Sequence, residues 1–205
     1  QNKALELCLF LSLPASLALL VASEDIISAL FGYGSFDQVS AFNSGKALYF
    51  FALGLPAFSL IKVFSSFFFA NHDTKIPFYI SLISVLVNIL ISIYYFNEVG
   101  FVIIPIATSL SSWLNALLLF IFLKNRNLFS FHGVFLINLI KIVGASLLMG
   151  VFFNFLIIYF QKELSFDQNL KSFYLILSVL LSLCFYLIVS YWIKAFKMSE
   201  FKLKY

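Results

Sequence analysis

The 205-residue sequence carries little charge: only 11% of its residues are acidic or basic, and it contains two cysteines and four prolines. Soluble domains carry about 25% charged residues, and chains that remain disordered combine high charge with few apolar residues. Two cysteines are too few for a secreted module held together by disulfides. The composition therefore excludes a disordered chain, a disulfide-stapled module and an ordinary nucleic-acid-binding domain, so no nucleic acid is expected as a partner.

Apolar residues are abundant instead, at 62% of the chain with a mean hydropathy of +1.03. A helix that spans a bilayer needs about 20 mostly apolar residues. The sequence therefore predicts an all-α, polytopic transmembrane helical bundle with six spans. These lie at about 4–23, 47–70, 77–96, 101–123, 133–160 and 172–193.

The first residue is Gln1, and no signal peptide precedes the first apolar run. The chain is therefore expected to be the C-terminal part of a longer protein.

Lys and Arg are divided unequally between the two sides that six spans define. Because cytoplasmic loops are enriched in these residues, the richer side is predicted to be cytoplasmic, and an even number of spans places both chain ends there. The richer side carries Lys3, Lys75, Lys124, Arg126, Lys194, Lys197, Lys202 and Lys204. The poorer side carries Lys46, Lys162 and Lys171, with the acidic Glu24, Asp25, Asp37, Glu98, Glu163 and Asp167. Lys62 and Lys141 lie within spans.

Motifs of common enzyme classes do not occur in the sequence. We find no GxSxG, HExxH, P-loop or CxxC pattern, and nearly every carboxylate falls in a loop or at an expected membrane interface. Cys8 and Cys184 have no neighbours at metal-ligand spacing. The sequence therefore predicts a membrane protein that is not an enzyme.

Polar residues form stripes on the third and fourth predicted spans. Their steps of three and four place each stripe on one helix face, and such groups are costly toward lipid, so they should face other helices or a water-filled cavity. The serines are equally consistent with ordinary helix packing, whereas the larger Asn88 and Asn115 favour a site or a buried hydrogen-bond network. The stripes are Ser81, Ser84, Asn88 and Ser92, and Thr108, Ser111, Ser112 and Asn115.

Lys62 lies on the second predicted span, about 13 Å from its cytoplasmic end at 1.5 Å per residue. Ser59 and Ser66 share its helix face. Two interpretations remain open: Lys62 faces an aqueous cavity and attracts an anionic group, or it snorkels or is structurally paired.

The prolines predict kinks in three of the spans. Pro14, Pro56 and Pro105 fall inside predicted spans, where each should remove a backbone hydrogen bond and kink its helix. The residues Asp73 and Thr74 precede the third span and can cap its start.

Four stretches carry patterns of a known family. ALGLPAFSLIKVFSSFFFANHDTKIP runs from 52 to 77, LPASLALLVASEDIISALFGYGSF from 13 to 36, and ATSLSSWLNALLL from 107 to 119, and a turn at Gly100 and Phe101 precedes the last. Together they resemble the MurJ/MviN family of lipid II flippases. The resemblance is specific over about residues 10–125 and loose from 130 to the end.

The resemblance implies a fold. Members of the family have fourteen transmembrane helices in the MOP-type (MATE-like) exporter fold, with two six-helix lobes and two extra C-terminal helices. Residues 1–128 would supply four helices of the second lobe, and 129–205 the two extra helices and a cytoplasmic tail.

The resemblance also implies a function. It is the translocation of lipid II, the undecaprenyl-pyrophosphate-linked peptidoglycan precursor, across the bacterial cytoplasmic (inner) membrane by alternating access. The implied partners are lipid II, membrane lipids and the N-terminal half of the same transporter.

The resemblance also bears on site residues, since Lys62 matches the lysine of the family's KV pair. Together with the polar helix faces described above, this match predicts a substrate cavity that contains Lys62, Ser59, Ser66 and Asn115. A sodium site of the family corresponds to Asn88, Ser92, Ile104 (through its carbonyl) and Thr108. Ser92 stands where the family has an aspartate, so we expect weak sodium binding. No cofactor beyond this coupling ion is expected.

Two other functions remain open at the level of sequence. One is a MOP-type exporter of another polyprenol-linked glycan or of a small cation, and the other is a membrane scaffold that transports nothing. A single lobe is not expected to flip a lipid alone, because alternating access requires two bundles that move against each other.

Overall fold

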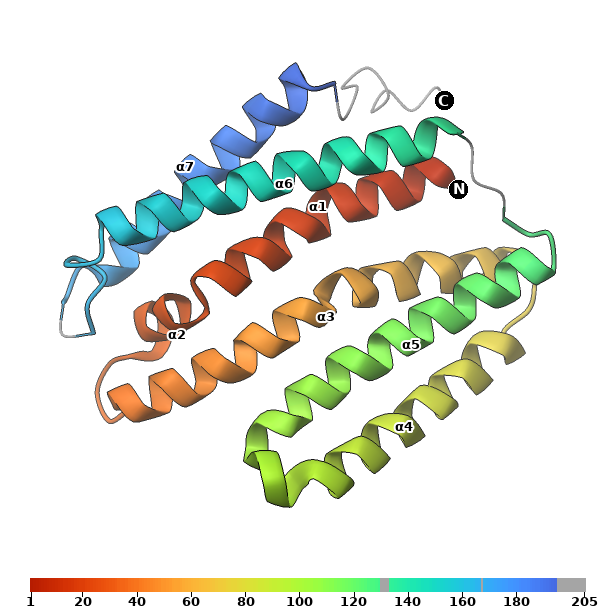
Figure 1. Ribbon diagram of the computed structural model, residues 1–205, viewed down its shortest axis with the longest axis horizontal. Helices are drawn as coiled ribbons and strands as arrows, with labels where there is room; N and C mark the ends of the chain where they lie inside the picture. Colours follow the sequence, from red (N-terminus) through yellow and green to blue (C-terminus); the bar gives the residue numbers. More distant parts are fainter. Residues whose placement is uncertain (130–132, 167, 195–205) are drawn as a thin grey trace.

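The computed structural model describes residues 1–129, 133–166 and 168–194, and those residues form helices and connecting turns without a strand (Figure 1). This confirms the all-α prediction. The helices are α1 (Asn2–Val21), α2 (Ser23–Phe31), α3 (Gln38–Ala70), α4 (Lys75–Val99), the 3₁₀ helix η1 (Gly100–Val102), α5 (Ile103–Asn125), α6 (Gly133–Tyr159) and α7 (Lys171–Trp192).

Five segments of the described chain are long and apolar enough to cross a membrane. One of them, Lys75–Asn125, has 51 residues and turns back on itself at η1, so that α4 and α5 run antiparallel (Figure 1). Gly100 makes this turn with a φ of 72°, a conformation that residues with a Cβ rarely adopt. The segment therefore supplies two crossings, which confirms the six predicted spans.

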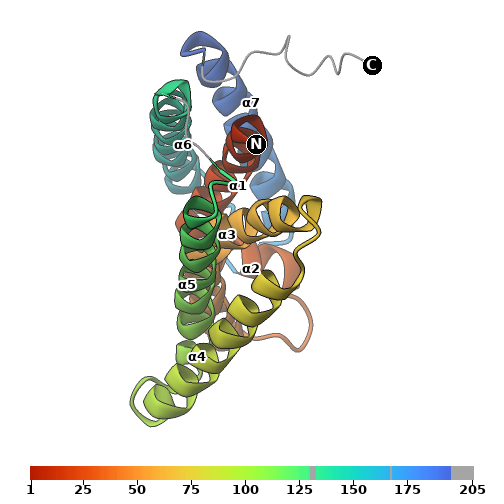
Figure 2. The same cartoon turned by 90° about the vertical axis from the view of Figure 1, so that its right-hand side faces the viewer.

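Helix α1 lies at the centre of the bundle and contributes to two apolar cores. Its Leu5 and Leu9 pack with α3 and α5, and its Phe10 packs with α6 and α7. Helix α4 packs on α5 and diverges from α3, as Figure 2 shows from the side. The outward faces of α4, α6 and α7 expose large apolar side chains, as expected of surfaces that meet lipid or another part of a transporter.

The second span begins earlier than the predicted 47–70. Helix α3 starts at Gln38 and contains 33 residues, which is about 50 Å at 1.5 Å per residue. The Asp37 carboxylate accepts a hydrogen bond of 2.8 Å from the Ser40 backbone N–H and caps this start. Hydrogen bonds from the Ser40 hydroxyl and N–H also lower the pKa of Asp37. Helix α3 therefore consists of the predicted apolar span and an additional, more polar N-terminal segment over residues 38–46.

The short helix α2 was not among the predicted elements, because nine residues are too few to span a bilayer. It packs closely on the extended start of α3. A Cβ added at Gly45 would lie 2.9 Å from the Glu24 Cα atom, so this crossing requires a glycine.

The prolines differ in their effect. Pro14 and Pro56 lie inside α1 and α3, and α3 changes direction near its middle (Figure 1). Pro105 is the third residue of α5, where an α-helix has no internal partner for its N–H groups. The kink predicted at Pro105 is therefore wrong.

Candidate functional site

The bend in α3 is held by side chains from two other helices. Pro56 has no N–H, so the carbonyl of Ala52, four residues earlier, loses its helical partner. The Ser16 hydroxyl of α1 donates to this carbonyl at 2.6 Å. From α5, the Trp113 Nε1–H donates to the Leu53 carbonyl at 3.0 Å, and the Ser109 hydroxyl donates to that of Phe50. The carbonyl that Pro56 frees is therefore bonded from α1, and two neighbouring carbonyls of the bend accept hydrogen bonds from α5.

Gly54 allows α3 and α5 to approach closely at this bend. A Cβ added there would lie 2.7 Å from the Ser109 Oγ atom and 3.1 Å from the Ser109 Cα atom. The contact joins the ALGLPAF stretch to the ATSLSSWLNALLL stretch. Two of the sequence patterns that carry the family resemblance are thus two sides of one helix crossing.

Helix α1 is stabilised in the same way at Pro14. The carbonyl of Phe10, four residues earlier, accepts a hydrogen bond of 2.8 Å from the Tyr186 hydroxyl of α7. Sequence reasoning did not single out Ser16, Trp113 or Tyr186. For Ser16 and Tyr186, the available signal was the carbonyl that Pro56 or Pro14 leaves unpaired, which must find a donor when it is buried.

The polar stripes of α4 and α5 face each other, as expected for groups that avoid lipid. The Asn88 Nδ2 atom donates to Thr108 Oγ1 at 3.1 Å and to Ser111 Oγ at 3.3 Å. A long contact of 3.5 Å joins Asn115 Nδ2 to Ser81 Oγ. Between the helices lies a groove of about 250 Å³, lined by Ser81, Ser84, Val85, Asn88, Thr108, Ser111, Ser112 and Asn115.

Three of the four residues expected at a sodium site are linked by hydrogen bonds. The Thr108 hydroxyl accepts from Asn88 and donates to the Ile104 carbonyl at 2.8 Å. The Ser92 Oγ atom is buried and has no hydrogen-bond partner among the described residues. No acidic side chain lines the groove, and Asn88 turns its N–H₂ group toward Thr108. The four positions therefore offer neutral groups, three of which are already hydrogen-bonded to one another.

The residues expected in the substrate cavity lie in two places. Lys62, Ser59 and Ser66 are on α3, where the Ser66 hydroxyl donates to the Lys62 carbonyl at 2.8 Å and Ser59 is within hydrogen-bond reach of the Cys8 thiol. The Lys62 side chain is exposed and forms no ion pair with any described residue. Asn115 is buried between α5 and α4. No hydrogen bond joins it to the α3 group within the described ranges.

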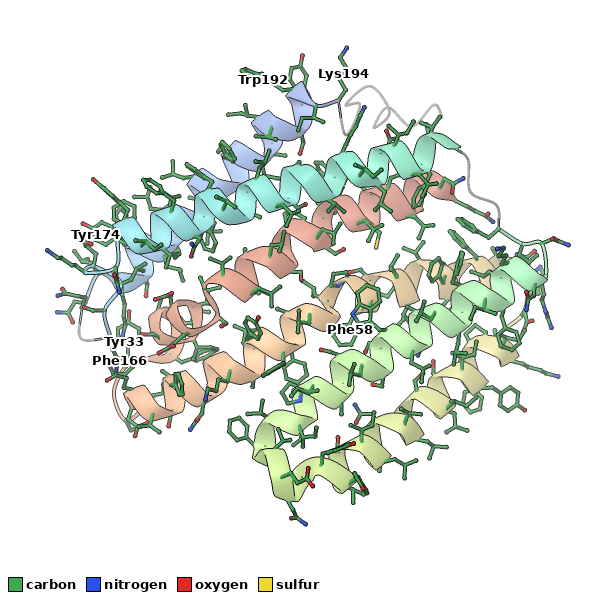
Figure 3. All side chains as sticks on the ribbon, in the orientation of Figure 1. Tyr33, Phe58, Phe166, Tyr174, Trp192 and Lys194 are labelled. Atoms are coloured by element: carbon green, nitrogen blue, oxygen red, sulfur yellow. The ribbon has the colours of Figure 1, made fainter. Side chains whose placement is uncertain are left out.

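The opposite end of the molecule contains a lysine that is completely buried. Lys171, the first residue of α7, is 1% exposed, whereas the sequence predicts a loop charge on the side poorer in Lys and Arg. Its ammonium donates to the carbonyls of Gly32 at 2.6 Å and Phe166 at 2.7 Å. It also lies 4.5 Å from the centre of the Tyr33 ring and 4.4 Å from that of Phe166. Both aromatic residues are labelled at the left-hand end of the molecule in Figure 3. A cation is favourable at the carbonyl end of α2, so Lys171 fastens α7 to α2.

An ion pair closes the loop before α4. The Arg126 guanidinium lies 2.6 Å from the Asp73 carboxylate, and Asp73 also accepts hydrogen bonds from the backbone N–H groups of Lys75 and Ile76. The predicted capping role of Asp73 is confirmed. The Thr74 side chain makes no capping bond.

The fold and the polar faces enclosed between its helices define a multi-pass membrane protein. The family model for the lipid II flippase MurJ matches residues 1–174. The chain belongs to this family, and the match continues through α6, beyond the stretches that carried the resemblance in the sequence.

Individual relatives agree with the family match. The "Probable lipid II flippase MurJ" of Rhizobium meliloti is 40% identical over 150 residues, which cover 73% of this chain and 28% of that protein. The "Lipid II flippase MurJ" of Burkholderia cenocepacia is 26% identical over 97% of this chain and 38% of that protein. The chain therefore spans well under half the length of these relatives.

The fold also matches a solved structure. That protein, "Lipid II flippase MurJ, inward closed conformation", has a TM-score of 0.75 and 27% sequence identity to this chain. The similarity covers 92% of this chain and 37% of the other. The match confirms that the chain has the helical arrangement of part of a MOP-type flippase.

Proposed function

We propose that the chain forms the C-terminal part of a lipid II flippase and contributes to the translocation of lipid II across the bacterial cytoplasmic (inner) membrane by alternating access. The observation that carries this proposal is the family match over residues 1–174, accompanied by structural similarity over 92% of the chain. The six spans agree with the last six helices of a fourteen-helix transporter. The function is transport rather than enzymatic catalysis.

The other partner in this proposal is the N-terminal half of the transporter. The relatives are two to three times longer than the chain, and alternating access requires two bundles. Residues 1–128 would belong to the second lobe, and residues 129–205 would add two peripheral helices and a tail. Consistent with this division, α6 and α7 pack mainly on α1 and on each other.

Both chain ends are proposed to lie in the cytoplasm, from the distribution of Lys and Arg. Part of this charge, at Lys197, Lys202 and Lys204, lies outside the described residues. So does Asp167 on the opposite side.

Lys62 is proposed to attract the pyrophosphate of lipid II. Its side chain is exposed on a membrane-spanning helix and has no ion-pair partner among the described residues, and an unpaired charge at membrane depth is costly unless it meets water or an anion. Ser59 and Ser66, on the same face, would add hydroxyl groups to the cavity wall. Asn115 would act from the separate α4–α5 groove.

Sodium is proposed to bind weakly, if the transport cycle uses it. The Asn88, Ser92, Ile104 and Thr108 positions offer neutral groups only, and the described residues hold no cluster of three His, Cys, Asp or Glu side chains. Replacing Ser92 with Asp would restore a carboxylate at the buried hydroxyl that has no partner. The expected result is sodium-dependent stabilisation of Ser92→Asp, measured as a shift in unfolding temperature, and no shift in the unchanged chain.

The function can be tested with a hybrid transporter. The chain replaces the matching segment of the Rhizobium meliloti relative, and the hybrid is expressed in cells depleted of their own flippase. We expect growth and translocation of labelled lipid II to the outer leaflet. A hybrid that inserts at a normal level but moves no lipid II would contradict the proposed function.

The role of Lys62 is tested in the same hybrid. Lys62→Ala is expected to lower translocation at least tenfold, and Lys62→Arg to retain it because the positive charge remains. Lys46→Ala is the matched control, since Lys46 is also exposed on α3 but lies over the Phe42 ring near the helix start. Unchanged transport in Lys62→Ala would remove Lys62 from the mechanism.

A further inference from the structure

A second polar cavity lies where α2, the start of α3 and the α6–α7 connection meet, at the left-hand end of the molecule in Figure 1. Its volume is about 310 Å³. No basic side chain is among the described residues that line it. The polar residues of the lining are Glu24, Asp25, Ser28, Gln38, Gln161 and Ser165.

Two adjacent carboxylates enter this cavity from the first turn of α2. The Glu24 backbone is held in place by its close contact with Gly45 of α3. Within the described part of the chain, neither Glu24 nor Asp25 forms an ion pair. Burial, and then the negative charge of Glu24, raise the pKa of Asp25. The protein thus holds two like charges side by side without a countercharge.

Ser28 supplies a second, independent sign of a ligand. It follows Glu24 by four residues and Asp25 by three, so the three side chains share one face of α2. The residue is only 6% exposed and lines the cavity, yet its Oγ atom has no hydrogen-bond partner among the described residues. A buried hydroxyl is normally satisfied, so the cavity offers this oxygen for a bound group.

The other members of the lining are also oxygen donors. Gln38 at the start of α3, and Gln161 and Ser165 after α6, bring one amide or hydroxyl oxygen each from segments far apart in the sequence. Hard divalent cations prefer carboxylate, carbonyl, hydroxyl and water oxygens, and Ca²⁺ accepts flexible sets of six to eight. Two carboxylates would also balance the charge of one divalent ion.

We propose that this cavity binds a hard divalent cation of the calcium type, held by Glu24 and Asp25 with the Ser28 hydroxyl and neutral oxygens of the cavity wall. The site lies on different helices from the Asn88–Thr108 group and does not depend on lipid transport. Bound there, the ion would tie α2 to α3 and to the α6–α7 connection. With only two carboxylates, the expected dissociation constant is on the order of 10⁻⁴ to 10⁻³ M.

The nearby Lys171 does not occupy the proposed site. Its ammonium lies in the neighbouring pocket, which contains Gly32, Tyr33 and Phe166, and it is bonded to the carbonyls of Gly32 and Phe166. Phe166 lines both pockets, and its ring lies 4.4 Å from the Lys171 ammonium. The lysine charge is therefore directed at backbone oxygens rather than at the carboxylates.

The test is equilibrium binding of ⁴⁵Ca²⁺ to the purified chain in phosphatidylcholine nanodiscs, which carry no anionic lipid. We expect one saturable site per chain. The double variant Glu24→Gln/Asp25→Asn should weaken binding at least tenfold, and Ser28→Ala several-fold. Glu98→Gln is the control, because Glu98 is an exposed carboxylate on the same predicted side but outside the cavity. Its binding should match that of the unchanged chain.

Circular dichroism in calcium-free buffer shows whether each variant retains its helices, so that a loss of binding is separated from unfolding. Absence of saturable binding to the unchanged chain would overturn the proposal. So would equal weakening by Glu98→Gln and by the double variant, since that result identifies general surface charge as the cause. Neither outcome bears on lipid II transport by the hybrid.

Discussion

Three charged side chains of this protein differ in how far the folded chain compensates their charge. Lys171 is buried against two carbonyls and two aromatic rings. Arg126 pairs with Asp73, which also caps α4. Asp25 has only its own helix start and no basic partner among the described residues. Of these three groups, Asp25 is therefore the one whose charge is least compensated.

Stability is expected to depend on pH through Asp25. Because burial and Glu24 raise its pKa above the ordinary 3.8, the folded chain holds this proton more firmly than the unfolded chain. Stability due to Asp25 is therefore present at low pH and is lost as the pH rises through the folded pKa. In calcium-free buffer, Asp25→Asn should raise the unfolding temperature at pH 7 and leave it unchanged near pH 3.

Asp37 is the control for this prediction, because its pKa is shifted in the opposite direction from that of Asp25. Its pKa is lowered by hydrogen bonds from Ser40, so its contribution is present at neutral pH and is lost as the pH falls through that lowered value. Asp37→Asn should therefore lower the unfolding temperature at pH 7, or leave it unchanged if the amide caps as well. A stabilising Asp37→Asn, or a destabilising Asp25→Asn at pH 7, would contradict this account.

At the scale of helices, the prolines inside α1 and α3 have one feature in common. Each proline leaves the carbonyl four residues earlier without an N–H partner, and a hydroxyl from another helix replaces it: Ser16 at Ala52 and Tyr186 at Phe10. The backbone at each proline is thereby coupled to tertiary packing. Helix α1 donates to the bend in α3, and α7 donates to α1 at the carbonyl that Pro14 leaves unpaired.

Removing the Ser16 hydroxyl should leave the Ala52 carbonyl without a hydrogen-bond donor and lower the free energy of unfolding. Ser16→Ala is expected to destabilise the fold by about 1–3 kcal/mol, the usual cost of leaving a buried polar group unsatisfied. The measurement is equilibrium unfolding in mixed detergent micelles. Ser12→Ala is a matched control, because Ser12 is equally buried on α1 but its Oγ has no partner among the described residues.

A double mutant separates this mechanism from general packing. Pro56→Ala restores an N–H that can bond to the Ala52 carbonyl, so Ser16→Ala should cost less in that background. Equal costs of Ser16→Ala with and without Pro56, or equal costs of Ser12→Ala and Ser16→Ala, would show that the bend is not what the hydroxyl stabilises.

The α3–α5 crossing is expected to depend on Gly54. Gly54→Ala would place its Cβ 2.7 Å from Ser109 Oγ and 3.1 Å from the Ser109 Cα atom, so the helices must move apart at a cost of about 1–3 kcal/mol. Gly144→Ala is the control inside α6, where an added Cβ meets nothing within 4 Å. There the higher helix propensity of alanine should be neutral or stabilising. The same unfolding assay measures both, and similar effects at the two glycines would contradict the prediction.

At the scale of the whole molecule, the antiparallel hairpin of α4 and α5 determines the count of crossings. With two crossings in Lys75–Asn125, the chain passes the membrane six times and its connections alternate between two sides (Figure 1). The loop at Asp73 and the residue Arg126 lie on one side, joined by their ion pair. The α2–α3 connection and the start of α7 lie on the other, joined at Lys171.

This arrangement can be tested by cysteine labelling in intact cells. In a Cys8→Ala/Cys184→Ala background, Asn127→Cys should be protected from an impermeant maleimide, and Gln168→Cys should react, because basic loops remain in the cytoplasm. Both residues are exposed loop positions. Reaction of Asn127→Cys with protection of Gln168→Cys would reverse the orientation, and reaction of both would contradict the count of six.

The sequence by itself determined that the protein lies in a lipid bilayer, that it has six spans and that it belongs to the family. It also determined which helix face carries each polar stripe. These features depend on length, apolar content and helical periodicity, which are local properties of the chain. The same local information identified the cap at Asp73 and the positions of Pro14 and Pro56. It misjudged Pro105, because a boundary between helices is set by the turn that precedes it.

Only the tertiary structure decided how those helices use their polar groups. The burial of Lys171 and the donors to the proline-freed carbonyls depend on contacts between residues far apart in the sequence. The extension of α3 to Gln38 combines a local cap at Asp37 with the packing of Gly45 against Glu24. The tertiary structure also separated Asn115 from Lys62 and gathered Glu24, Asp25 and Ser28 around one cavity. A hydroxyl or a charge near the membrane has no fixed role of its own, because its free energy depends on the group that packing places next to it.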